Sequence, residues 1–173
     1  MRKLKFLIPL LVFMILGGCS SRSVVNTEPS VISSSYLLQH SGVLTIADKR
    51  MPLRGMLQLN PAQQHARVVM LNDMGMKLLV AEITADDAGG FESKELFSSP
   101  FLRMIPHFYD ESMHCIYEIF LAPQQSALKK ANIITKGKKI IGKREFAAHT
   151  IINDPQGRYT LELFLNSGSI KDF

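Results

Sequence analysis

The chain contains 173 residues, of which 46% are hydrophobic, a length and composition that suit one domain with a substantial core. Its formal net charge is +5, but three of the 20 Lys and Arg residues lie within the first five positions, so the remaining 17 face 15 acidic residues, a balance of +2. The mature protein is therefore only weakly basic, and we expect no nucleic-acid partner.

The first 18 residues predict a cleaved secretion signal. A basic start is followed by an apolar run, residues 6–16, that is shorter than a membrane span and so disfavours an uncleaved anchor. Gly17 and Gly18 stand directly before Cys19, and a lipoprotein signal peptidase needs such small residues to reach the bond it cuts. The segment resembles bacterial lipoprotein precursors. That resemblance implies that Cys19 begins the mature protein and carries acyl chains that anchor it in a membrane.

The residues after the cysteine bear on location and organisation. In Gram-negative lipoproteins an aspartate directly after the cysteine favours the inner membrane, so Ser20 implies the periplasmic face of the outer membrane. Residues 19–35 are polar and without sustained period, which predicts a flexible tether. Lipidation of Cys19 would leave Cys115 without a disulfide partner, so we expect Cys115 to be a buried, apolar helix residue.

Short apolar segments broken by turn residues follow the tether. Leu53, Leu57 and Leu59 alternate with polar or flexible residues, the period of a half-buried strand over residues 51–60. Similar patterns predict strands over residues 42–48, 66–71, 76–84 and 91–97, with hairpin turns between them. A second set is predicted over residues 131–136, 139–146, 149–152 and 158–165, with a tight turn at Lys136-Gly137-Lys138.

Between the two strand sets the period becomes helical. One apolar stripe is formed by Met113, Ile116, Tyr117, Phe120 and Leu121. Asp110 is the predicted N-cap, and Pro123 is predicted to stop the helix and to open a second one through Ala127 and Leu128. A further helical turn is predicted over residues 101–105, before Pro106.

These elements predict an α+β fold, in which a curved antiparallel sheet forms an unclosed half-barrel covered by a helical lid inserted between the two strand sets. We expect this single domain to span residues 36–173. Where the lid covers the concave apolar face incompletely, a cavity for acyl chains results. The candidate ligand-binding residues are Leu44, Leu57, Val69, Leu78, Ile116, Phe120 and Leu163.

The order of elements resembles the lipoprotein-localisation (Lol) fold, a half-barrel lidded by helices that binds the acyl chains of lipoproteins in transit. Within that group the chain is similar to a family of small outer-membrane lipoproteins of unknown function. Three motifs carry the similarity: Leu71-Asn72-Asp73-Met74-Gly75-Met76-Lys77-Leu78-Leu79; Ile119-Phe120-Leu121-Ala122-Pro123 with Ala127-Leu128; and Asn153, Gly157, Tyr159, Leu161 and Leu163. The resemblance spans about residues 36–166 and implies acyl-chain or lipoprotein cargo, or a lipid-like aryl polyene pigment, whose genes accompany some relatives.

Other side chains give weaker signals. We find no Gly-rich phosphate loop, nucleophile elbow, HExxH or paired-cysteine motif, so we expect a non-enzymatic protein without catalytic residues, cofactor or metal. His107, Asp110, His114 and Glu118 approach the spacing of a helical metal site, but a solvated helix face explains them better. The basic residues between Lys129 and Arg144 either face anionic lipid or, as we favour, form a solvated edge.

Two hypotheses of different classes remain for the function. The first is an outer-membrane lipoprotein that binds or transfers acyl chains or a similar hydrophobic molecule in envelope biogenesis. The second is a structural or scaffold lipoprotein that docks a periplasmic complex through a sheet edge or the basic patch. Methionines such as Met56 and Met70 either line an adaptable apolar surface or fill gaps in the core, and Met74 and Phe91 could insert into a membrane from loop tips.

Overall fold

The computed structural model describes residues 34–86, 88–122 and 132–172, which belong to one compact unit. The predicted signal segment, the predicted lipidation site Cys19, most of the predicted tether and the predicted second helix through Ala127 and Leu128 lie outside the described residues. Within the described part of the chain, no helix is both long and apolar enough to cross a membrane.

Eight strands form one antiparallel sheet in the order β5-β4-β3-β2-β1-β8-β7-β6. The strands are β1 (Ser34–Ile46), β2 (Lys49–Asn60), β3 (His65–Asn72), β4 (Lys77–Ala85), β5 (Phe91–Ser98), β6 (Ile133–Ile141), β7 (Arg144–Asn153) and β8 (Tyr159–Asp172). Two helices, α2 (Pro100–Arg103) and α3 (Phe108–Phe120), lie between β5 and β6. The predicted fold class, a curved and unclosed antiparallel sheet with a helical insertion between two strand sets, is confirmed.

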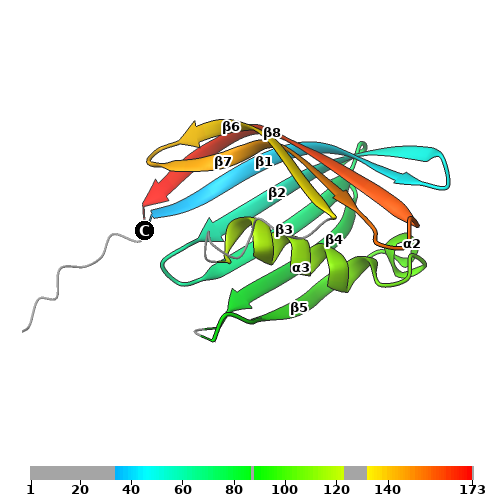
Figure 1. The fold of residues 1–173 in the computed structure, drawn as a ribbon, viewed down its shortest axis with the longest axis horizontal. Helices are drawn as coiled ribbons and strands as arrows, with labels where there is room; N and C mark the ends of the chain where they lie inside the picture. The colour runs from blue at the N-terminus through cyan, green and yellow to red at the C-terminus, as the bar shows by residue number, and fades with distance from the viewer. Residues whose placement is uncertain (1–33, 87, 123–131, 173) are drawn as a thin grey trace, which may run out of the picture. The chain divides into compact units, whose positions relative to one another are not determined.

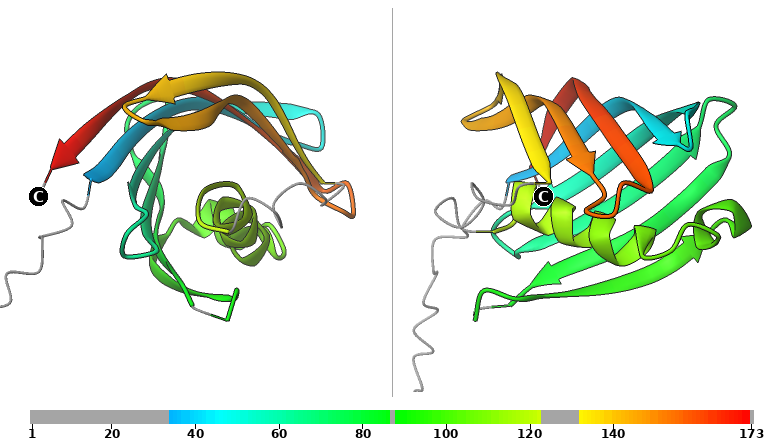
Figure 2. Two further views of the ribbon diagram at one scale, coloured as in Figure 1. Left: turned by 60° about the vertical axis from the view of Figure 1, so that its left-hand side comes forward. Right: turned by 45° about the vertical axis from the view of Figure 1, so that its right-hand side comes forward.

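The first strand joins the two halves of the sheet. β1 pairs with β2 on one side and with β8 on the other, which leaves β5 and β6 as the two edge strands. The segment that contains α2 and α3 connects one edge to the opposite edge, and Figures 1 and 2 show α3 lying against the concave side of the arch. The covering of the concave face is therefore built into the connectivity.

Local irregularities accompany the curvature of the sheet. The register shifts at Gln39/His40 between β1 and β8, and again between β3 and β4 and between β4 and β5. Such bulges bend a strand and increase its twist. On β1, a Cβ atom added to Gly42 would lie 2.6 Å from the carbonyl oxygen of Glu162, closer than any side chain tolerates. Glycine at this position lets the neighbouring strands approach.

Several strand predictions differ from the structure, among them the break predicted between residues 146 and 149, which β7 crosses without interruption. β1 begins at Ser34, inside the predicted tether, because its first residues pair with residues 167–172 of β8, a distant segment that no local pattern reveals. The predicted turn at Lys136-Gly137-Lys138 is wrong: β6 runs through Gly137, and the chain reverses at residues 142–143, between the paired Ile141 and Arg144. Gly142, with a φ of 61°, takes the first turn position, where two-residue hairpins favour glycine.

The predicted apolar stripe of the long helix is confirmed, but its start is not. Met113, Ile116 and Phe120 are buried in α3. The N-cap is His107, in a left-handed conformation, and Asp110 lies in the first turn, so the predicted N-cap is wrong. The helix begins earlier because Phe108, 1% exposed, is buried in the core and packs edge-on against Tyr159 at 5.1 Å between ring centroids.

Polar and aromatic contacts fasten α3 to both halves of the sheet. The Tyr117 hydroxyl donates to the Gly89 carbonyl at 2.8 Å, and its ring stacks on Phe91 at 4.7 Å. On the other side, Glu111 accepts hydrogen bonds from Arg158 and from the Tyr159 hydroxyl, each at 3.0 Å. The helix is therefore tied to the β4–β5 turn and to the start of β8.

The C-terminal end of α3 is bound to the sheet by a separate contact. Nη2 of Arg144 donates to the Phe120 carbonyl at 2.6 Å, and the guanidinium lies 5.4 Å from the Phe146 ring centroid. The last carbonyls of a helix lack intrahelical partners and carry partial negative charge, so a cation there is favourable. Arg144, at the start of β7, thus connects the second half of the sheet to the end of the lid.

We predict that Arg144→Ala lowers the free energy of unfolding by about 1.5–3 kcal/mol, because it removes a charge-assisted hydrogen bond to a helix end. Urea unfolding followed by circular dichroism measures the change. Lys138→Ala is the control: its ammonium pairs with Glu145 on an exposed hairpin and should contribute below about 1 kcal/mol. Equal losses in the two variants would contradict the role of Arg144.

Candidate functional site

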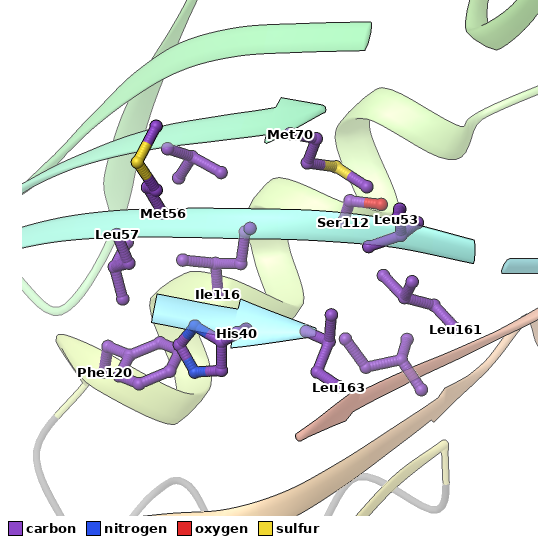
Figure 3. Close-up of a pocket in the computed structure, with 13 residues that line it drawn as sticks. His40, Leu53, Met56, Leu57, Met70, Ser112, Ile116, Phe120, Leu161 and Leu163 are labelled. Carbon is purple, nitrogen blue, oxygen red and sulfur yellow. The ribbon is translucent and has the colours of Figure 1, made fainter. Parts of the chain in front are cut away.

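An apolar cavity lies between the concave face of the sheet and α3. Figure 3 shows the side chains that line it. The sheet supplies residues from β1, β2, β3, β7 and β8, and α3 supplies three residues one turn apart. The lining residues are His40, Leu53, Gly55, Met56, Leu57, Val68, Met70, Ser112, Ile116, Phe120, Ile152, Leu161 and Leu163.

Four of the seven predicted ligand-binding residues line this cavity: Leu57, Ile116, Phe120 and Leu163. Leu44 and Leu78 are buried in the core but do not line it. Val69 lies on the outer face of β3 and does not line the cavity. Its neighbours Val68 and Met70, on the inner face, line the cavity instead. Ligand binding by any of these residues stays a prediction.

The sequence contains a signal that would have placed β3 correctly. Arg67 is exposed and Val69 only half-buried, whereas Ala66, Val68 and Met70 are buried. Because alternate strand residues share a face, the charged Arg67 assigns Val69 to the outer side. No comparable signal exists for His40 or Ser112. The pattern of the strand or helix that contains each residue shows that it faces inward, but not whether it borders a cavity or a packed core.

The cavity exists partly because of a glycine. His40 on β1 faces Gly55 on β2, and a Cβ atom at Gly55 would meet only the Cβ of His40, at an ordinary contact distance of 3.6 Å. The space that a side chain would take on β2 is therefore left open. Glycine in a strand interior often marks such a place, where a ligand or another chain segment approaches the backbone.

The free space is narrow. The volume open to the centre of a water molecule is about 40 Å³, and a single buried water needs roughly 10–15 Å³. The cavity thus has room for a few waters and would admit a longer apolar molecule only if lining side chains moved. Phe120, 9% exposed at the C-terminal end of α3, contacts His40 edge-on at 6.2 Å between ring centroids.

The lining is electrostatically neutral. None of the lining residues within the described ranges carries a carboxylate, an ammonium or a guanidinium group, and their polar side chains are those of His40 and Ser112. Burial lowers the pKa of His40 from 6.5 to about 4, because the surrounding apolar groups do not solvate an imidazolium ion. His40 is therefore neutral at physiological pH.

The residues considered for a metal site do not converge. Asp110 and His114 border a shallow pocket with Glu111, Cys115 and Asn132, whereas His107 lies at the helix start. Within the described residues, no group of three or more His, Cys, Asp or Glu side chains could hold a metal ion. Cys115 is buried, as predicted.

The possible membrane-inserting side chains and the basic region are the two other surfaces that the sequence indicates. Met74 is 74% exposed at the turn between β3 and β4, whereas Phe91 is half-buried against Tyr117 and is not free to insert elsewhere. In the basic region, Arg144 binds the end of α3, and Lys139 donates to the carbonyls of Leu165 and Asn166 on β8. These two cations thus stabilise the fold, while Lys136 and Lys138 are exposed.

Fold and cavity together define a half-barrel of eight antiparallel strands with a narrow, neutral, apolar cavity under an inserted helix. No protein-family model matches the chain, and comparison with curated proteins gives no match.

We predict that stability falls between pH 6.5 and about 4 because of His40. In this window the unfolded chain binds a proton at His40 that the folded protein, with its pKa lowered to about 4, does not bind. The native state is fully favoured above pH 6.5 and loses about 3 kcal/mol by pH 4. Urea unfolding across this range measures the loss.

His40→Gln should flatten the pH dependence in that window. The same replacement at His65, at the start of β3 and outside the cavity, is the control and should leave the slope in place. An unchanged slope in His40→Gln would show that other groups cause the pH dependence.

Proposed function

We propose that the protein is an outer-membrane lipoprotein that binds or transfers acyl chains, or a similar hydrophobic molecule, in envelope biogenesis. The apolar cavity under α3 carries this proposal, because an otherwise filled core keeps open space lined by Leu57, Ile116 and Phe120. Burial of apolar ligand surface would drive binding at about 25 cal/mol per Å² before the costs of association.

The sequence supplies the location in this proposal. Gly17-Gly18-Cys19 would provide the lipid anchor, Ser20 the outer-membrane address, and the following residues a tether that holds the cavity near the bilayer. The half-barrel with an inserted helix is the arrangement that a Lol-like fold would have. That likeness supports, for the cavity, a cargo that carries acyl chains.

Ligand entry would require movement at one end of the lid. The start of α3 is held by Glu111, whose carboxylate is bound by Arg158 and Tyr159. At the other end, the Phe120 ring lines the cavity, and a change of its rotamer would widen the cavity without unfolding the helix. We infer that Phe120 is the gate.

A scaffold function is the second candidate, and the narrowness of the cavity favours it. An exposed edge strand is a ready template for pairing with another chain. β6 is such an edge, and it exposes Ile134 and Ile140, by 43% and 74%. A periplasmic protein could add a strand there.

We predict that the full-length protein, extracted from bacterial membranes, carries about one non-covalent acyl compound per chain in addition to its anchor. Native mass spectrometry followed by lipid analysis measures this. Gly55→Val should reduce the occupancy about tenfold, because its methyl groups would occupy the cavity and overpacking costs about 1–3 kcal/mol. Valine suits a strand, so the fold should be retained.

Val69→Leu is the matched control, since it enlarges a half-buried side chain on the outer face of β3 that does not line the cavity. It should leave the occupancy unchanged. A wild-type protein with an empty core and a stable protein partner would reject the carrier function in favour of the scaffold function.

A further inference from the structure

One buried hydroxyl in the cavity has no partner. Among the described residues, three buried side-chain atoms lack a hydrogen-bond partner, and of these Ser112 Oγ is the one at the cavity. Ser112 is 1% exposed. A serine inside a helix can donate to the carbonyl four residues earlier, but this hydroxyl makes no such bond.

The position of Ser112 relates it to the rest of the site. Ser112, Ile116 and Phe120 are spaced by four residues and form the stripe of α3 that lines the cavity. Helical rise separates the first from the last by about 12 Å. Figure 3 shows Ser112 near Met70 and Leu53, and His40 beside Phe120. The cavity is thus elongated, with one hydroxyl at one end and one imidazole at the other.

The groups around the hydroxyl restrict what can bind there. Leu53 and Leu161 offer no hydrogen bond and the Met70 thioether only a weak acceptor, and among the described residues the lining contains no cation that could balance a carboxylate. An ionised head group buried without a counter-charge is strongly disfavoured. The His40 imidazole is neutral and can donate or accept one hydrogen bond, but it supplies no positive charge.

We propose that the ligand is a neutral amphiphile, an extended apolar chain with an uncharged hydroxyl or carbonyl group that hydrogen-bonds to Ser112 Oγ, rather than an ionised fatty acid. This proposal rests on the proposed function and deepens it. An alcohol or the ester carbonyl of an acylglycerol group has the required chemistry. The apolar chain would run along α3 from Ser112 towards Phe120.

The test compares two probes of equal chain length, 1-decanol and decanoate, at pH 7.5. The full chain in lipid nanodiscs is titrated with each probe, and the methyl NMR signals of Ile116, Ile152 and Met70 report binding inside the cavity. We expect 1-decanol to bind at least about tenfold more tightly than decanoate, a difference of about 1.4 kcal/mol.

Ser112→Ala should weaken 1-decanol binding about fivefold, because one hydrogen bond is lost, and should leave decanoate unchanged. Both proteins are measured in identical nanodiscs, so partitioning of the probes into lipid cancels. Ser35→Ala is the matched control. It removes a buried serine outside the cavity that donates to the Lys171 carbonyl at 3.2 Å, and it should not change binding.

Thermal unfolding without probe gives an independent readout. Ser112→Ala should unfold at an equal or higher temperature than the wild type, because it removes an unpartnered hydroxyl, whereas Ser35→Ala should unfold at a lower one. A lower unfolding temperature for Ser112→Ala would reveal an internal partner and overturn the proposal.

Different results would overturn the neutral-ligand proposal and the proposed carrier function. Equal affinity for both probes, or an unchanged affinity of Ser112→Ala for 1-decanol, would overturn the neutral-ligand proposal while leaving hydrophobic binding intact. If neither probe shifts the cavity methyl signals, the proposed carrier function fails as well.

Discussion

A curved sheet with one apolar face must have that face covered, and within the described part of the chain the inserted helix α3 lies across it. The connection between the two edge strands crosses the concave side, so α3 lies where the apolar side chains of the arch converge. Its own stripe, with Met113 and Ile116, completes the core. Burial on this scale is non-directional, and the directional contacts of Glu111, Tyr117 and Arg144 set the position of the helix.

The cavity lies where the side chains of α3 and of the sheet do not fill the space between them. Side chains of normal size along α3 and the sheet would interlock fully, but Gly55 leaves a gap on β2, and the small Ser112 leaves one on the helix. Two polar groups, His40 and Ser112, remain in that gap at a cost in stability. Buried polar atoms without partners are uncommon in folded proteins, and the position of one of them, Ser112 Oγ, beside free space connects it with a ligand.

Much of the fold was predictable because its signals are local. Alternation along β2 and along the inward-facing Tyr159, Leu161 and Leu165 of β8 identified strands, and the helical stripe identified the lid. The predicted boundaries were wrong where contacts between segments distant in the sequence determine where an element begins or ends. β1 extends to Ser34 because β8 pairs with it, and α3 begins before Asp110 because Phe108 packs on Tyr159. The hairpin reverses at Gly142 although Gly137 has the same local chemistry.

The period of each element, the order of the elements and the predicted lipid anchor could be derived from the sequence, because they depend on neighbouring residues or on a short motif. The sequence also placed Leu57, Ile116, Phe120 and Leu163 on the inner face. Where the inner face stays unfilled, and which polar groups border that space, depends on how the elements pack together. A cavity is a property of how far surfaces from β1, β2, β8 and α3 approach one another, and no single segment encodes that distance.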